Sequence, residues 1–244
     1  NPMFLTIPSI RVTQIKISPQ NTIVAKKLLK FSWVGRIVDM KYFTLKHSLI
    51  KLNSIQPELG YKVEINIIGQ GNYLSCLKKD CLKLKNISIL FIDHLSPSEL
   101  NTFLLHQTDV LLAMGTSALE GAKLGVPTLL LDISFTEIPE GYVYTWLHER
   151  RNNDIADILD FNDLKPGNQT LKEKIAQLLL CYEEVSKKEL KYFKKNHSLD
   201  TISETLLKLC QETTLSWNML KVGKFLKKGY VYKLFFLLRS LGTH

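Results

Sequence analysis

The chain has 244 residues, of which 45 % are hydrophobic and 23 % are charged. This composition excludes intrinsically disordered and collagen-like proteins, and the length fits one large domain or two small ones. The net charge of +9 is unevenly spread, because residues 215–244 hold six Lys or Arg side chains and no Asp or Glu. We therefore expect a globular protein whose basic character is concentrated near its C-terminal end.

The four cysteines and the apolar runs bear on the cellular compartment. No Cys-x-x-Cys motif and no Cys/His cluster at zinc spacing occurs, which favours reduced thiols over a disulfide framework. No apolar run approaches the roughly 18–20 residues that a membrane-spanning helix needs, and the N-terminus lacks the pattern of a signal peptide. The sequence predicts a cytoplasmic protein, and because it opens Asn-Pro-Met we expect it to be part of a longer one.

Along the chain, residues 1–30 contain three prolines and a loose apolar alternation, which predicts a connector with a short edge strand. From residue 31, short β-rich runs alternate with segments of helical spacing. The expected strands are 31–34, 63–68, 88–92, 110–112 and 128–131, and the expected helices between them are 40–54, 72–84, 97–107 and 117–125. This alternation predicts an α/β domain over residues 31–165, with a Rossmann-like, doubly wound parallel sheet.

Residues 166–244 are expected to form a helical C-terminal appendage, with helices at about 169–195, 198–213 and 215–240. In the last of these, aromatic and aliphatic residues alternate at helical spacing with Lys221, Lys224 and Lys228. A basic amphipathic helix suits an anionic membrane surface, but packing onto another domain gives the same pattern. Both interpretations stay open, and no nucleic-acid recognition motif accompanies the basic residues.

In doubly wound sheets, ligands bind at the carboxyl ends of the strands. The first strand is followed by Gly35, Arg36 and then Lys41, so two cations can converge on an anion unless both are ordinary surface charges. The second is followed by Gly69-Gln70-Gly71, which lets the backbone approach a ligand closely. Since Leu74 replaces the third glycine of a dinucleotide fingerprint, nicotinamide and flavin dinucleotides are disfavoured.

The fourth strand is followed by a segment typical of a phosphate cradle. Its residues are Gly115, Thr116, Ser117, Ala118 and Leu119. The glycine permits a tight turn, the Thr or Ser side chain can cap the next helix, and the N–H groups of the first turn face a ligand. Glu120 follows one turn into the helix, within reach of a ribose, although an ordinary capping box has the same spacing.

Taken together and in this order, these motifs resemble the C-terminal, donor-binding domain of GT-B glycosyltransferases of the family-four type (glycosyl transferases group 1). The resemblance covers about residues 30–132. It implies that Arg36 and Lys41 hold the donor diphosphate, that Glu120 binds the nucleotide ribose, and that residues 115–119 meet the phosphates and the donor sugar. The first glutamate of the family's E-x7-E motif is replaced by Leu112.

The resemblance also implies a donor substrate linked to UDP or GDP, with no metal and no further cofactor. The acceptor, a saccharide or lipid-linked molecule of cell-surface polysaccharide or glycolipid assembly, would bind an N-terminal domain outside this sequence. Such an enzyme would be cytoplasmic and peripheral on the inner face of the plasma membrane.

Other interpretations stay open. His94, after the third strand, either lines the base pocket or is a polar loop residue, and the six histidines show no metal-site spacing. One alternative function is a GT-B-fold sugar-nucleotide epimerase, which needs acid and base groups in its cleft. Another is a non-catalytic module that binds a membrane or a partner protein.

Overall fold

The computed structural model describes residues 6–9, 20–150, 154–159 and 170–212. The chain divides into a compact unit up to Ile202 and a second unit, Ser203–His244. The helix expected at 215–240 lies outside the described residues. Within the part that the structure describes, no helix combines the length and the apolar character needed to cross a membrane.

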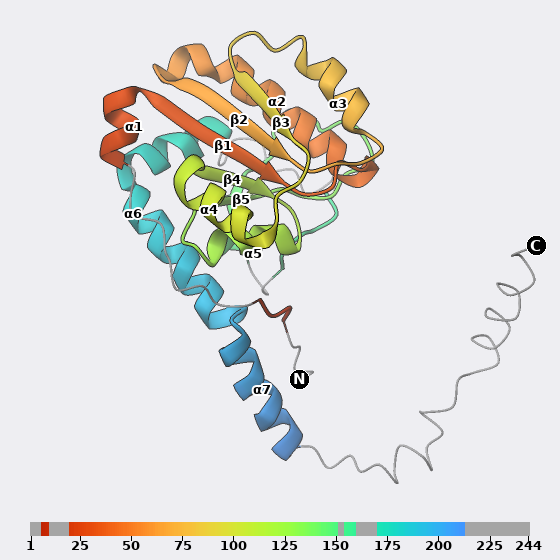
Figure 1. Ribbon diagram of the computed structural model, residues 1–244, viewed down its shortest axis with the longest axis vertical. Coiled ribbons are helices and arrows are strands. Elements are labelled where there is room, and N and C mark those ends of the chain that lie inside the picture. Colours follow the sequence, from red (N-terminus) through yellow and green to blue (C-terminus); the bar gives the residue numbers. More distant parts are fainter. Residues whose placement is uncertain (1–5, 10–19, 151–153, 160–169, 213–244) are drawn as a thin grey trace, which may run out of the picture. The chain divides into compact units, whose positions relative to one another are not determined.

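The first unit is built around a six-stranded sheet (Figure 1). Its strands are β1 (Leu28–Val34), β2 (Lys62–Ile68), β3 (Ser88–Ile92), β4 (Val110–Ala113), β5 (Thr128–Leu130) and β6 (Thr145–Trp146). They lie in the order β3-β2-β1-β4-β5-β6; the first five are parallel and β6 is antiparallel to β5. The chain order reverses between β1 and β4, which is the switch point where doubly wound sheets bind ligands.

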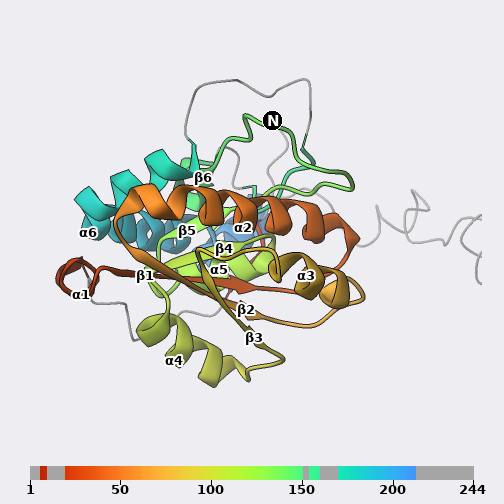
Figure 2. The ribbon, with the colours of Figure 1, turned by 90° about the horizontal axis from the view of Figure 1, so that it is seen from above.

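Helices cover both faces of the sheet, as Figure 2 shows for α2 and α3 on one face and α4 on the other. The helices are α1 (Gln20–Lys26), α2 (Asp39–Leu59), α3 (Leu74–Cys81), α4 (Pro97–Gln107), α5 (Thr116–Ala122), the 3-10 helix η1 (Leu147–Glu149), α6 (Leu171–Asn196) and α7 (Leu199–Glu212). Alternate residues of β4 enter two separate cores: Leu112 packs with α2, and Leu111 packs with α4 and α5. The doubly wound α/β fold is therefore confirmed.

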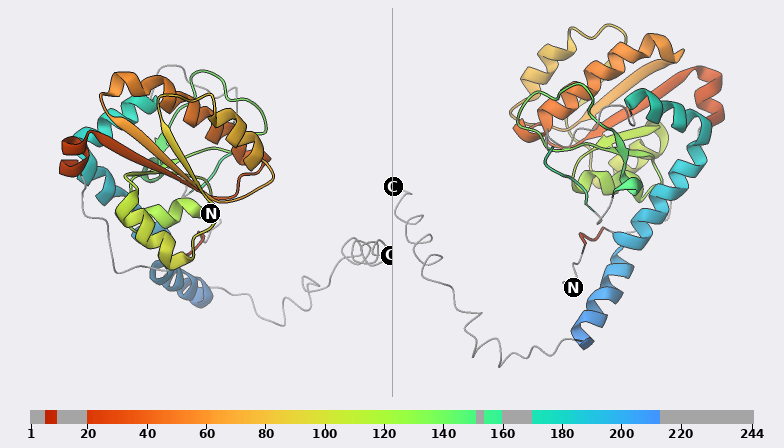
Figure 3. Two further views of the ribbon diagram at one scale, coloured as in Figure 1. Left: turned by 45° about the horizontal axis from the view of Figure 1, so that its top comes forward. Right: turned by 180° about the vertical axis from the view of Figure 1, so that it is seen from behind.

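Helix α6 packs along the first unit and is seen from behind in Figure 3. A capping box of Thr170 and Glu173 begins it, and non-helical torsions at Cys181 (φ −133°, ψ 41°) bend it. Its apolar side chains contribute to both cores, because Leu178 belongs to the α2 side and Phe193 to the α4 side. The bend thus lets one helix pack against both layers.

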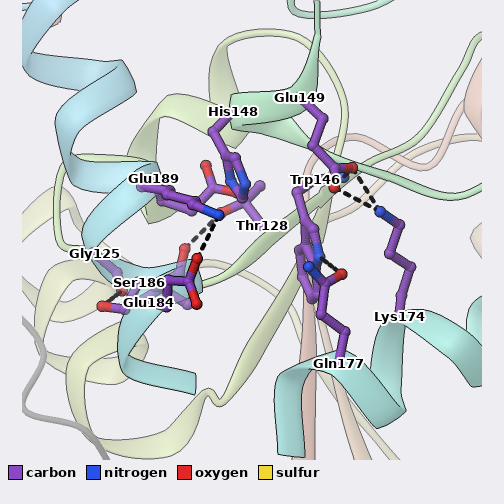
Figure 4. A network of polar contacts seen from close by, with 12 residues as sticks. Gly125, Thr128, Trp146, His148, Glu149, Lys174, Gln177, Glu184, Ser186 and Glu189 are labelled. Atoms are coloured by element: carbon purple, nitrogen blue, oxygen red, sulfur yellow. Dashed lines mark hydrogen bonds and ion pairs between the residues drawn. The ribbon is translucent and has the colours of Figure 1, made fainter. Parts of the chain in front are cut away.

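Polar contacts fix α6 to the segment after β5 (Figure 4). Lys174 Nζ donates to both carboxylate oxygens of Glu149, at 2.8 and 2.6 Å, and Trp146 Nε1 donates to Gln177 Oε1 at 2.9 Å. Further along, His148 Nδ1 lies 2.9 Å from Glu189 Oε1. Burial raises the pKa of the Glu189 carboxyl, against the opposing effect of His148.

The start of the described chain and the last strand of the sheet depart from the sequence expectation. Helix α1 occupies part of the segment expected to be an extended connector, and β1 begins at Leu28 instead of residue 31. After Asp132, where no strand was expected, the two residues Thr145–Trp146 pair with β5 and extend the sheet.

Candidate functional site

The loops that leave β1 and β2 lie against each other at the carboxyl end of the sheet. Gly35 N donates to Ile68 O at 3.1 Å, and Ile37 N donates to Gln70 O at 2.9 Å. A Cβ added to Gly69 would stand 2.2 Å from Gly35 O, and one added to Gly71 would stand 2.1 Å from Ile37 O. The close approach that these two glycines permit is therefore between two loops of the protein.

A cavity of about 610 Å³ opens above these loops. Its lining residues are Val34, Gly35, Arg36, Ile68, Gly69, Gln70, Gly71, Asp93, His94, Leu95 and Leu100. Five residues singled out from the sequence, including the exposed His94 at the end of β3, are thus brought to one place. The cavity spans the carboxyl ends of β1, β2 and β3, next to the switch point.

Lys41 reaches this place from the first turn of α2. Its Nζ and the Oγ of Ser117 each lie 3.5 Å from the position that a Cβ on Gly35 would occupy. Burial, together with the nearby Arg36 guanidinium, lowers the pKa of Lys41. Among the residues that the structure describes, no carboxylate forms an ion pair with either cation, so both remain available to an anion.

The N-cap of α5 is not the residue that the sequence predicts. Gly115, not Thr116 or Ser117, is the N-cap, with φ 68° and ψ −145°, and no side chain caps the helix. Ser117 Oγ instead donates to Met114 O at 3.0 Å. The expectation of a Thr or Ser cap is wrong, because glycine alone adopts this backbone conformation without strain and thereby ends β4 abruptly.

Not every amide of the expected cradle faces outward. Gly115 N donates to Ile155 O at 2.7 Å, and Ala118 N donates to Gly115 O at 3.0 Å. The side chains of Ala118 and Leu119 are buried in the α4-side core. Thr116, which is exposed, and Ser117, beside Lys41, are the parts of this segment nearest to solvent and to the cations.

Glu120 has a partner that the sequence analysis missed. Its carboxylate forms an ion pair with Lys123, whose side chain is only 8 % exposed. It is thus not part of a capping box, and it does not line the cavity beside Arg36. Leu112, at the position of the family's first glutamate, lies inside β4 and is fully buried, so that position contributes no group to the site.

A second polar cluster follows β5. Asp132 accepts hydrogen bonds from Arg150 and from the Tyr142 hydroxyl, and Arg150 Nη1 also donates to Asp157 Oδ2 at 3.2 Å. Burial raises the pKa of Asp132, and the positive charge of Arg150 opposes that shift. Asp132 itself could have been found from its place directly after a buried strand, whereas its partners depend on the tertiary fold.

Neither family models nor curated proteins match the sequence. Solved structures do match. The lipopolysaccharide outer core galactosyltransferase WaaB is 13 % identical and superposes with a TM-score of 0.53, over 86 % of this chain and 56 % of that one. The chain has the fold of one half of a GT-B glycosyltransferase.

Two further structures have similar identity. The C-terminal domain of a group 1 glycosyl transferase (LpcC) from Francisella tularensis is 13 % identical, with a TM-score of 0.48 over 76 % of this chain and 96 % of that domain. A TarM variant from S. aureus, solved with UDP, is 14 % identical, with a TM-score of 0.49 over 84 % of this chain and 38 % of that one. The chain thus spans 38 % and 56 % of the lengths of TarM and WaaB.

Proposed function

We propose that this chain is the donor-binding domain of a GT-B glycosyltransferase and that it binds a nucleoside-diphosphate sugar. The observation that carries the proposal is the pair of unneutralised cations at the switch point of the sheet. Lys41 and Ser117 approach Gly35 from two different helices, and Arg36 lies at the mouth of the adjoining cavity. A site that gathers two cations without a paired carboxylate suits a diphosphate.

In the proposed reaction, the bond between the anomeric carbon of the sugar and the diphosphate oxygen breaks. The electron pair leaves with the diphosphate, the acceptor hydroxyl forms the new bond to the sugar, and its proton passes to the departing diphosphate. Arg36 and Lys41 would stabilise the charge that develops on the departing diphosphate, because they are already positioned before the reaction begins. Lys41 must be protonated to do so, and its lowered pKa therefore predicts weaker diphosphate binding as the pH rises into the alkaline range.

The other residues expected at the site would contact other parts of the donor. His94, Gly69 and Gly71 line the cavity, where the base would lie. Glu120, held by Lys123, would receive the ribose hydroxyls, in line with its place in the family motif. The acceptor, of saccharide or lipid-linked type, would bind the other half of the enzyme, and we assign the protein to the cytoplasm at the inner face of the plasma membrane.

Calorimetric titration of the full chain with UDP, GDP, ADP and CMP tests the proposal. We expect one diphosphate to bind and Lys41→Met to weaken it about 10- to 100-fold, since a charge-assisted hydrogen bond contributes about 1.5–3 kcal/mol. Lys26→Met, at an exposed lysine of α1, is the matched control and should bind as the wild type does.

The same titration separates the alternatives. Absence of binding by all four nucleotides, or equal binding by the wild type and Lys41→Met, contradicts a donor site at the switch point and favours a non-catalytic module. Glu120→Ala tests the ribose contact separately, because its loss should weaken nucleoside diphosphates and leave inorganic pyrophosphate unaffected.

A further inference from the structure

A second cavity, of about 440 Å³, lies between α3 and β3. The residues that line this α3–β3 groove are Lys78, Cys81, Leu82, Leu84, Ile87, Ile89 and Phe91. It shares no lining residue with the candidate donor site. Leu82 is 73 % exposed at its rim, so a large apolar side chain faces solvent beside an apolar recess.

The groove runs beside an open strand edge. In the sheet that the structure describes, β3 is the last strand on its side (Figure 2). Gly69 N donates to Ile92 O at 2.9 Å, so the backbone of Ile92 faces β2. Because the N–H and C=O groups of successive residues in a strand point to opposite sides, those of Ile89 and Phe91 face the open edge. Their side chains meanwhile line the groove.

Residues 78–85 form a positively charged rim, because Lys78, Cys81, Leu82 and Leu84 line the groove and the segment holds four lysines and one acid. Lys78, Lys79, Lys83 and Lys85 are exposed, and none of them forms an ion pair with a described residue. Asp80, the acid within this segment, accepts a hydrogen bond from the Tyr42 hydroxyl.

The described lining of the groove carries one cation and no carboxylate. Lys78 Nζ lies 5.3 Å from the ring centre of Phe91, which brings a cation to the groove itself. Burial raises the pKa of Cys81 to about 11, so that the thiol remains neutral. An apolar recess, an open strand edge and an unneutralised basic rim therefore occur together.

We propose that the α3–β3 groove binds an extended acidic segment of a partner protein. The segment adds a strand beside β3 and bonds with the outward N–H and C=O groups of Ile89 and Phe91. Alternate side chains of such a strand point to opposite faces, so its apolar residues enter the groove while its carboxylates meet the lysines. This surface is independent of nucleotide binding and does not rest on the proposed donor site.

The same features disfavour two other occupants. A second copy of this chain, paired edge to edge, would bring its own basic rim against this one, and like charges repel. A lipid bilayer would place the backbone groups of Ile89 and Phe91 in hydrocarbon, where unpaired N–H and C=O groups are costly. An acidic strand satisfies the backbone and the charge together.

Selection of a random twelve-residue peptide library, displayed on phage, against the full chain provides the test. We expect enriched peptides that combine acidic and apolar residues, and we would synthesise the most frequent one with a fluorescent label. Lys78→Glu/Lys83→Glu should raise its dissociation constant about tenfold or more. The matched control is Lys26→Glu/Lys27→Glu, two exposed lysines near the start of β1, which should change it little.

Amide hydrogen exchange then shows whether a strand is added. Binding of the peptide should slow exchange at Ile89 and Phe91 and leave Leu90, whose N–H faces β2, as it was. The proposal is overturned if no peptide is enriched, if the enriched peptides are basic, or if exchange at Ile89 and Phe91 is unaltered. Edge-to-edge dimers in sedimentation, or binding of the chain to phosphatidylglycerol vesicles that is lost in Lys78→Glu/Lys83→Glu, would also overturn it.

Discussion

Glu149→Gln is expected to destabilise the protein by leaving the buried Lys174 without its counter-ion. Lys174 is 3 % exposed, and the two hydrogen bonds that its ammonium group makes to described residues both go to the Glu149 carboxylate, which is itself 28 % exposed. Glutamine keeps the shape and can still accept the hydrogen bond from Trp146 N, which Glu149 accepts at 2.8 Å. The substitution therefore removes the negative charge and replaces one of the two oxygens that accept from Lys174 with an NH2 group, leaving a buried cation without its counter-ion.

The expected loss in the free energy of unfolding follows from the difference in burial between Lys174 and Glu149. Breaking a buried ion pair by removal of one partner costs about 3–5 kcal/mol. Because the carboxylate is partly solvated and part of its attraction is screened, we expect about 2–3 kcal/mol for Glu149→Gln. Lys174→Met should cost less, about 0–1 kcal/mol, since it removes the buried charge and leaves a carboxylate that water reaches.

Urea unfolding of both variants and of the double variant, followed by circular dichroism, measures these free energies. The double variant should be close to Lys174→Met, because the glutamine matters only while the lysine is charged and buried. A loss below 1 kcal/mol for Glu149→Gln, or equal losses for the two single variants, would refute the reasoning that the buried cation sets the cost.

Three further outcomes follow from the structure. Gly69→Ala should lower the melting temperature and weaken nucleotide binding, because its Cβ would meet Gly35 O at 2.2 Å; unchanged values in a melting curve and a titration would contradict the loop contact. Since the folded pKa of Glu189 is raised, the folded state holds a proton that the unfolded state has released, so stability should fall as the pH rises from the ordinary carboxyl range through that raised pKa. Glu189→Gln should flatten that part of a stability profile measured by urea unfolding, and a profile as steep as the wild type's would argue against it. Lys123→Met should weaken UDP or GDP binding about threefold to tenfold by releasing Glu120, whereas Lys123→Arg should retain it; calorimetry that finds both variants alike would count against a positioning role.

The central α/β region could be predicted because short runs rich in apolar residues, each followed by a turn, alternate there with segments of helical spacing. Helix α2 continues past its expected end at residue 54, through Pro57, and stops at Gly60, which adopts φ 68° as its C-cap. Proline lacks only one donor near the end of a helix, so the glycine, and not the proline, terminates it. Strand β6 has two residues, and such a short pairing leaves no pattern that a sequence can show.

Part of the candidate site could likewise be predicted from the sequence, and part of it could not. Arg36, Gly69 and His94 each follow an expected strand. Because parallel strands end at the same edge of a sheet, this alone places the three residues together. The ion pair of Glu120 with Lys123 could have been suspected from their spacing of three on a helix, but the burial of Lys123 could not. Likewise, whether a glycine faces a ligand or another loop is decided by contacts between segments distant in sequence.

Only Met114 and Gly115 separate β4 from α5. Because the connection is this short and the strand before it is buried in the core, the packing beneath β4 fixes where the first turn of α5 begins. If the proposed function holds, a substitution in that core would shift Ser117 relative to Lys41, so the affinity for a diphosphate would change without any change to the residues that touch it.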